Sequence, residues 1–140
     1  MPDLDPLFHA FAALFAGGAA ASGWTASVIV ANTSFDGLDH GRADRHLRQV
    51  LVASAGFQAA LLGVAAGFAV MSGAMGAFIT AGLAALGFLS NIWTLAPRRD
   101  KTPEGVKKRG GSRRRVLAVA LTLMVTAVAL TAAGLASFGV

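Results

Sequence analysis

Residues 116–139 read VLAVALTLMVTAVALTAAGLASFG and contain no Lys, Arg, Asp or Glu. A helix of this length rises about 36 Å, which is enough to cross the roughly 30 Å hydrocarbon core of a bilayer. Three more segments without these charged residues precede it, at 8–31, 50–71 and 74–96. The sequence therefore predicts an all-α integral membrane protein, with one membrane domain in which four transmembrane helices form an antiparallel bundle.

The overall composition agrees with a lipid environment. Of the 140 residues, 55% are hydrophobic and only 14% are charged, and the mean hydropathy is +0.63, which is too apolar for a soluble domain of this size. All charged residues lie in 1–7, 32–49 and 97–115. The chain contains no cysteine, so a disulfide framework, a cysteine metal site and a thiolate nucleophile are excluded.

The basic residues predict the orientation. Three of the twelve lie in the loop 32–49 and nine in the loop 97–115, and both loops are on the same side of a four-span protein. The positive-inside rule places that side in the cytoplasm. We therefore expect a multi-pass protein of the cell membrane, of the bacterial inner-membrane type, with both termini periplasmic or extracellular. Lipid headgroups are the expected counter-charge, and nucleic acid is not expected as a partner, because the bases lie beside apolar segments without interleaved aromatic residues.

The second basic loop is the predicted contact with anionic lipid headgroups. It carries nine bases against Asp100 and Glu104, and a base near an anionic leaflet contributes about 1 kcal/mol. The alternative is that these bases only set the topology. The predicted headgroup contacts are Lys107, Lys108, Arg109, Arg113, Arg114 and Arg115.

No cofactor or metal is predicted. Transmembrane haem ligation needs histidines within the bundle, and the only histidine in a predicted span is His9 at its outer edge. In the first loop Asp36, His40 and Asp44 would share one face of a helix. Their competing arginines favour a solvated turn over a metal site, although metal binding there stays an open alternative.

Uncharged polar residues gather in the cytoplasmic halves of the predicted spans. They are either the lining of a pocket or vestibule, or hydrogen-bonding groups that hold the helices together, and we favour the second interpretation. This predicted polar cluster consists of Trp24, Thr25, Ser54, Gln58, Asn91, Thr122 and Thr126.

Small residues recur at helical spacing and predict faces on which helices approach closely. The glycines predicted to pack helices are Gly56, Gly63, Gly67 and Gly87. Whether these faces meet within one chain or between copies is open at this stage, and a homo-oligomer or a complex with another membrane protein is expected. Phe8, Phe11 and Phe15 form a further stripe at helical spacing, interpreted as a lipid or partner contact.

Two functions from different classes follow. The first is a non-catalytic scaffold or subunit of a membrane complex. The second is a small oligomeric channel or transporter for neutral or lipophilic solutes, which would work without an embedded carboxylate because the spans contain none. A lipid-modifying enzyme is a weaker third alternative, since the first-loop aspartates and histidines match no catalytic spacing.

Overall fold

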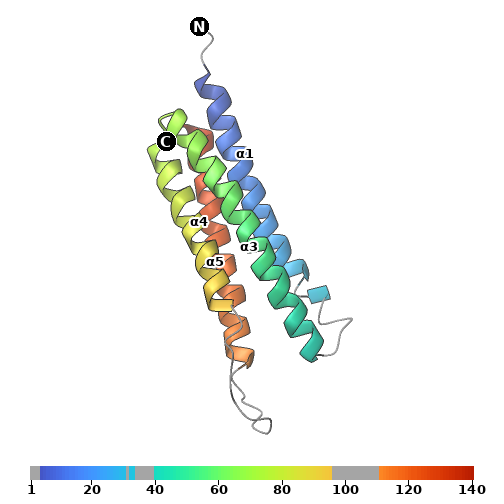
Figure 1. Ribbon diagram of the computed structural model, residues 1–140. Coiled ribbons are helices and arrows are strands. Elements are labelled where there is room, and N and C mark those ends of the chain that lie inside the picture. Colours follow the sequence, from blue (N-terminus) through green and yellow to red (C-terminus); the bar gives the residue numbers. More distant parts are fainter. Residues whose placement is uncertain (1–3, 31, 34–39, 96–110) are drawn as a thin grey trace.

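A computed structural model describes residues 4–30, 32–33, 40–95 and 111–140, and all of the secondary structure in these residues is helical (Figure 1). Helix α1 (Asp5–Trp24) continues into a π-helical turn, η1 (Thr25–Ile29), and is followed by α3 (His40–Met71), α4 (Met75–Leu95) and α5 (Gly111–Phe138). Four candidate spans, Asp5–Ile29, Arg45–Met71, Met75–Thr94 and Val116–Phe138, are long and apolar enough to cross a membrane. The prediction of four such helices is confirmed.

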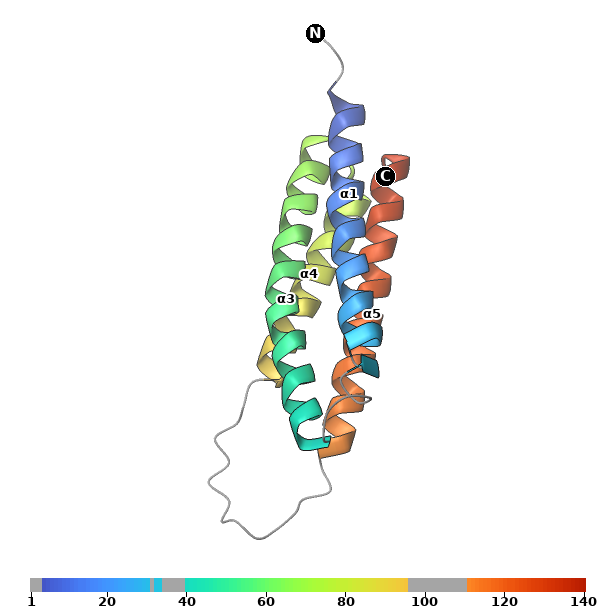
Figure 2. The ribbon, with the colours of Figure 1, turned by 90° about the vertical axis from the view of Figure 1, so that its right-hand side faces the viewer.

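The helices form one bundle in which consecutive helices run in opposite directions (Figure 2). Helix α1 packs against α3 and α5, and α4 packs against the same two helices from the other side. The start of α1, the α3–α4 turn and the end of α5 lie at one end of the bundle, which we call the turn end. The end of α1 and the starts of α3 and α5 lie at the opposite end, which we call the loop end.

Two glycines close the turn end. Gly73 and Gly139 have positive φ angles of 74° and 70°, a conformation that glycine adopts without a steric penalty. In each case the following N–H bonds to the carbonyl five residues earlier, from Ala74 to Ala69 at 2.9 Å and from Val140 to Leu135 at 3.0 Å. These are Schellman motifs, which pair the last carbonyls of a helix.

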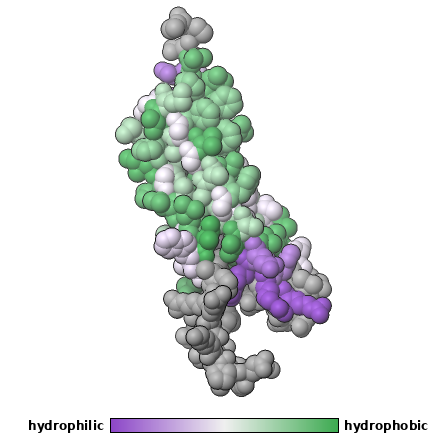
Figure 3. All heavy atoms as spheres, viewed as in Figure 1, coloured by the Kyte–Doolittle hydropathy of each residue, from purple (hydrophilic) through white to green (hydrophobic). Residues whose placement is uncertain are grey.

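The interior consists mainly of alanine. Its largest cluster surrounds Leu62 and Phe88, both 0% exposed, with alanines from all four helices. Large apolar side chains such as Leu14, Leu86 and Met124 instead point outward, and they cover the sides of the bundle in Figure 3. Small residues inside and large apolar residues outside are the arrangement expected for helices that pack closely within lipid.

Helix α3 is longer than its predicted span. It begins at His40, inside the segment 32–49 that the sequence analysis takes as a loop. Ala43, Leu47 and Leu51 are buried on one side of this extension, where Leu47 and Leu51 form a cluster with Ala26 and Ala118. Its other side carries exposed bases and forms the hydrophilic patch at the loop end in Figure 3. The extension is helical because its apolar residues recur every four positions and pack against η1 and α5.

The phenylalanine stripe of α1 packs within the chain. Phe8, Phe11 and Phe15 all stack on Phe68 of α3, with ring centroids 5.2 to 6.1 Å apart. The stripe therefore has an aromatic partner in the neighbouring helix, while Phe11 remains 36% exposed, and its lipid or partner contact stays a prediction.

Candidate functional site

Five polar side chains are buried in the described part of the bundle. Gln58 on α3 is 0% exposed and Asn91 on α4 is 1% exposed, while Ser27, Thr122 and Thr126 are 2 to 3% exposed. Ser27, Asn91 and Thr122 lie toward the loop end of the bundle, whereas Gln58 and Thr126 lie near the middle of their helices. We call these residues the polar layer.

The two amides join neighbouring helices. Nε2 of Gln58 donates to Oγ of Ser22 at 3.3 Å, which links α3 to α1. Nδ2 of Asn91 donates to Oγ1 of Thr122 at 3.0 Å, which links α4 to α5. The hydroxyls of Thr122 and Thr126 donate in turn to carbonyls one turn earlier in α5, at 2.8 and 2.7 Å. Each amide therefore bonds one helix to the next in the low-dielectric interior.

The predicted polar cluster divides into two groups. Gln58, Asn91, Thr122 and Thr126 point into the bundle, whereas Trp24 is 56% exposed and Thr25 is exposed. Thr25 and the partly buried Ser54 donate to carbonyls of their own helices, those of Ala21 and Leu51. Trp24 and Thr25 follow Gly23, which faces the interior, and each successive helical position turns by about 100°. Trp24 and Thr25 therefore point away from the buried polar residues, although all were predicted at a similar depth in the membrane.

Two serines of the site were absent from the predicted cluster. Ser22 accepts the Gln58 bond, and Ser27 is buried within η1. A helical turn separates Gly23 from Ser27, so the small buried face of α1 was the signal that could have found Ser27.

Three buried atoms of the polar layer have no hydrogen-bond partner among the residues that the structure describes. They are Oγ of Ser27, Oε1 of Gln58 and Oδ1 of Asn91. Ser27 lies in the π turn, where the N–H of Val30 bonds five residues back to Thr25. Such turns insert one extra residue and are frequent at functional sites. Here Ala26 and Ser27 are both buried although they are consecutive.

Of the four glycines predicted to pack helices, one lies against a neighbouring helix and three do not. A Cβ added at Gly87 would lie 2.7 Å from Cγ2 of Val125, so α4 and α5 are in close contact there. Gly56, Gly63 and Gly67 have no atom within 4 Å of such a Cβ. Gly23, which was not predicted, is in close contact with Thr126 and Phe88.

The remaining predicted contacts cannot be placed. Lys107, Lys108 and Arg109 lie outside the described residues, as do the side chains of Arg113, Arg114 and Arg115. The same holds for Asp36 and for the side chains of His40 and Asp44. Within the residues that were searched, no group of three His, Cys, Asp or Glu side chains could hold a metal ion.

Comparison with known proteins gives no relatives. No protein-family model, curated protein or solved structure matches this chain.

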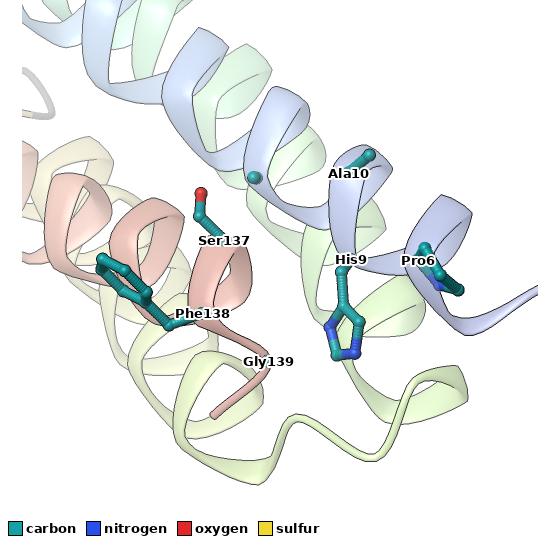
Figure 4. Close-up of a pocket in the computed structure, with 7 residues that line it drawn as sticks. Pro6, His9, Ala10, Ser137, Phe138 and Gly139 are labelled. Carbon is teal, nitrogen blue, oxygen red and sulfur yellow. The ribbon is translucent and has the colours of Figure 1, made fainter.

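A second feature is an open groove of about 500 Å³ at the turn end (Figure 4). The imidazole of His9 faces Gly139 across it, and its Nδ1 is buried without a partner in the described residues. The groove is lined by Pro6, His9, Ala10, Ala13, Ser137, Phe138 and Gly139.

The polar layer can bind but is poorly suited to proton transfer. Its amides and hydroxyls donate and accept hydrogen bonds and stay uncharged at neutral pH. Such groups hold helices in register or bind an uncharged polar molecule, and they lack the pKa near neutrality that a general acid or base requires.

Proposed function

We propose that this chain is a non-catalytic membrane protein that serves as a structural subunit of an oligomeric complex. The supporting observation is the outer face of α3, where Ala60, Gly63 and Gly67 are exposed. A Cβ added at either glycine would meet no other part of the described chain within 4 Å. A face of small residues lets another helix approach closely, which is how helices associate when both sides of the contact are apolar. A second copy of this chain is the proposed occupant, with the loop end in the cytoplasm beside anionic headgroups.

The burial and hydrogen bonding of the two amides support the structural role. Gln58 and Asn91 are buried to 1% exposure or less and each donates to a hydroxyl of a neighbouring helix. Groups that line a solute path need to be accessible to the solute. Their burial and pairing therefore favour interhelical bonding over transport through a single bundle.

The test is the mass of the full chain in mild detergent and in lipid nanodiscs. The wild type is expected to form an assembly of more than one copy. Replacing both Gly63 and Gly67 by leucine should reduce it to single chains, because the side chains would hold the second helix away. Gly82→Leu combined with Gly134→Leu is the matched control, since these two glycines also have open space around them but lie on α4 and α5.

Three results would contradict the proposal. The first is a wild type that is a single chain under both conditions, and the second is a leucine pair at Gly63 and Gly67 that keeps the full mass. The third is a wild type that conducts a defined neutral solute in proteoliposomes while Gln58→Leu is folded but inactive. A stoichiometric foreign protein in the complex would keep the structural role and replace the second copy as the occupant.

A further inference from the structure

The three atoms of the polar layer without partners need a ligand. Oγ of Ser27, Oε1 of Gln58 and Oδ1 of Asn91 belong to side chains that are 0 to 2% exposed. No group in the described residues bonds to them, and their burial keeps bulk water away. A buried polar group without a hydrogen bond is costly in an apolar interior, so such groups are commonly paired with ordered water when protein partners are missing.

The contacts of Gly23 place Ser27 and Asn91 at one level of the bundle. A Cβ at Gly23 would lie 3.4 Å from Cζ of Phe88, so α1 and α4 meet there across the bundle. Both helices run toward the loop end (Figure 1). Ser27 follows Gly23 by one turn, and Asn91 follows Phe88 by nearly one turn. Both residues therefore lie about one helical turn closer to the loop end than Gly23 and Phe88.

Gln58 approaches from α3, about one turn closer to the turn end. Its amide nitrogen bonds to Ser22, the residue directly before Gly23. Its unpartnered oxygen belongs to the same amide and therefore lies near the level of Ser22 and Gly23. The three side chains come from η1, α3 and α4.

The chemistry of these atoms defines the ligand. The two amide oxygens only accept hydrogen bonds, so the ligand must donate, and the serine hydroxyl can do either. The four predicted spans carry no Asp or Glu that would compensate a bound cation. The close contact of Gly23 with Thr126 and Phe88 leaves little room for a larger molecule. Water is the small, uncharged donor that fits.

We propose that Ser27, Gln58 and Asn91 hold internal water in the polar layer, beside the π turn of α1. The direct amide bonds link α1 to α3 and α4 to α5. Water at this level adds the link that they lack, between α1 and the diagonally opposite α4. The inference does not depend on the oligomeric state proposed above.

Radiolytic hydroxyl-radical labelling of the full chain in nanodiscs tests this site, because the radicals form from water beside the side chain that they oxidise. Phe88 is the probe, since it is 0% exposed and adjoins the Gly23 level. In the wild type, mass spectrometry should show rapid oxidation of Phe88. Asn91→Leu should reduce the labelling rate several-fold by replacing an acceptor with an apolar group, and Ser27→Ala should reduce it to a smaller extent.

Ser90→Ala is the matched control. Ser90 is exposed on the same helix and its hydroxyl donates to the carbonyl of Gly87, so its removal should leave Phe88 labelling unchanged. Phe138, which is 84% exposed, reports that radicals were produced. The inference is overturned if wild-type Phe88 stays unlabelled while Phe138 is oxidised, or if Ser27→Ala, the milder change, and a folded Asn91→Leu both label Phe88 at the wild-type rate.

Discussion

Gly82 and Gly87 lie on the same helix, α4, and differ in what faces them. A Cβ at Gly87 would meet Cγ2 and Cγ1 of Val125 at 2.7 and 3.0 Å, whereas a Cβ at Gly82 would meet nothing within 4 Å. The role of a glycine in this bundle is therefore decided by the opposite helix. The spacing of small residues along its own helix does not decide it.

This difference predicts opposite effects of the same substitution. Gly87→Ala should lower the free energy of unfolding by about 1–3 kcal/mol, as expected for overpacking in a tight interior. Gly82→Ala should be neutral or stabilising by up to about 1 kcal/mol, because alanine is the better helix former. Unfolding of both variants in the same detergent, followed by circular dichroism, measures the difference, and equal effects would contradict the α4–α5 contact.

At the scale of the element, the first turns of α3, residues 40–49, differ from the predicted loop. They lie before the predicted span, and their stability comes from one apolar face. Leu47 is 2% exposed in a cluster with Ala26, Leu51 and Ala118, while Arg42 is exposed on the opposite side. This segment therefore behaves as an amphipathic helix of a soluble protein that continues a membrane helix.

The asymmetry of this segment gives a second stability prediction. Leu47→Ala should cost about 2–5 kcal/mol, the usual range for truncating a buried leucine. Arg42→Ala, an exposed substitution in the same turns, should change stability by less than about 0.5 kcal/mol. Amide hydrogen exchange of residues 40–49 should locate the loss there. If the two variants exchanged at the same rate, the packing of the extension against η1 and α5 would be wrong.

For the whole molecule, the fold places the α3–α4 turn and the start of α5 at opposite ends of the bundle (Figures 1 and 2). The basic residues predict that the loop end is cytoplasmic. Because the chain has no native cysteine, Ser72→Cys and Gly111→Cys each provide one labelling site. An impermeant thiol reagent added outside intact cells should modify the cysteine at position 72 and leave that at 111 unmodified until the membrane is opened. Modification of both from outside, or of 111 alone, would contradict the orientation.

Several features of the site follow from the sequence and several do not. Gln58 and Asn91 could be predicted as interior residues, because an amide in the middle of a span is costly without a partner. Their partners, Ser22 and Thr122, could not be identified, because many serines and threonines lie at similar depths and only the packing of the helices selects among them. The π turn that contains Ser27 also has no sequence signature here, although the burial of Ser27 follows from its spacing to Gly23.

The sequence by itself determined that four apolar spans exist, because charged residues are too costly in lipid to interrupt a span, but it did not reveal that α3 begins at His40. Only the tertiary structure decided which side of each helix faces inward. In water, the alternation of polar and apolar residues marks the inner face of a helix. In a bilayer the surrounding lipid is as apolar as the protein interior, so this contrast is lost. Gly23 and Trp24 illustrate this, because the small residue lies in close contact with Thr126 and Phe88 while the large, mainly apolar residue after it is exposed.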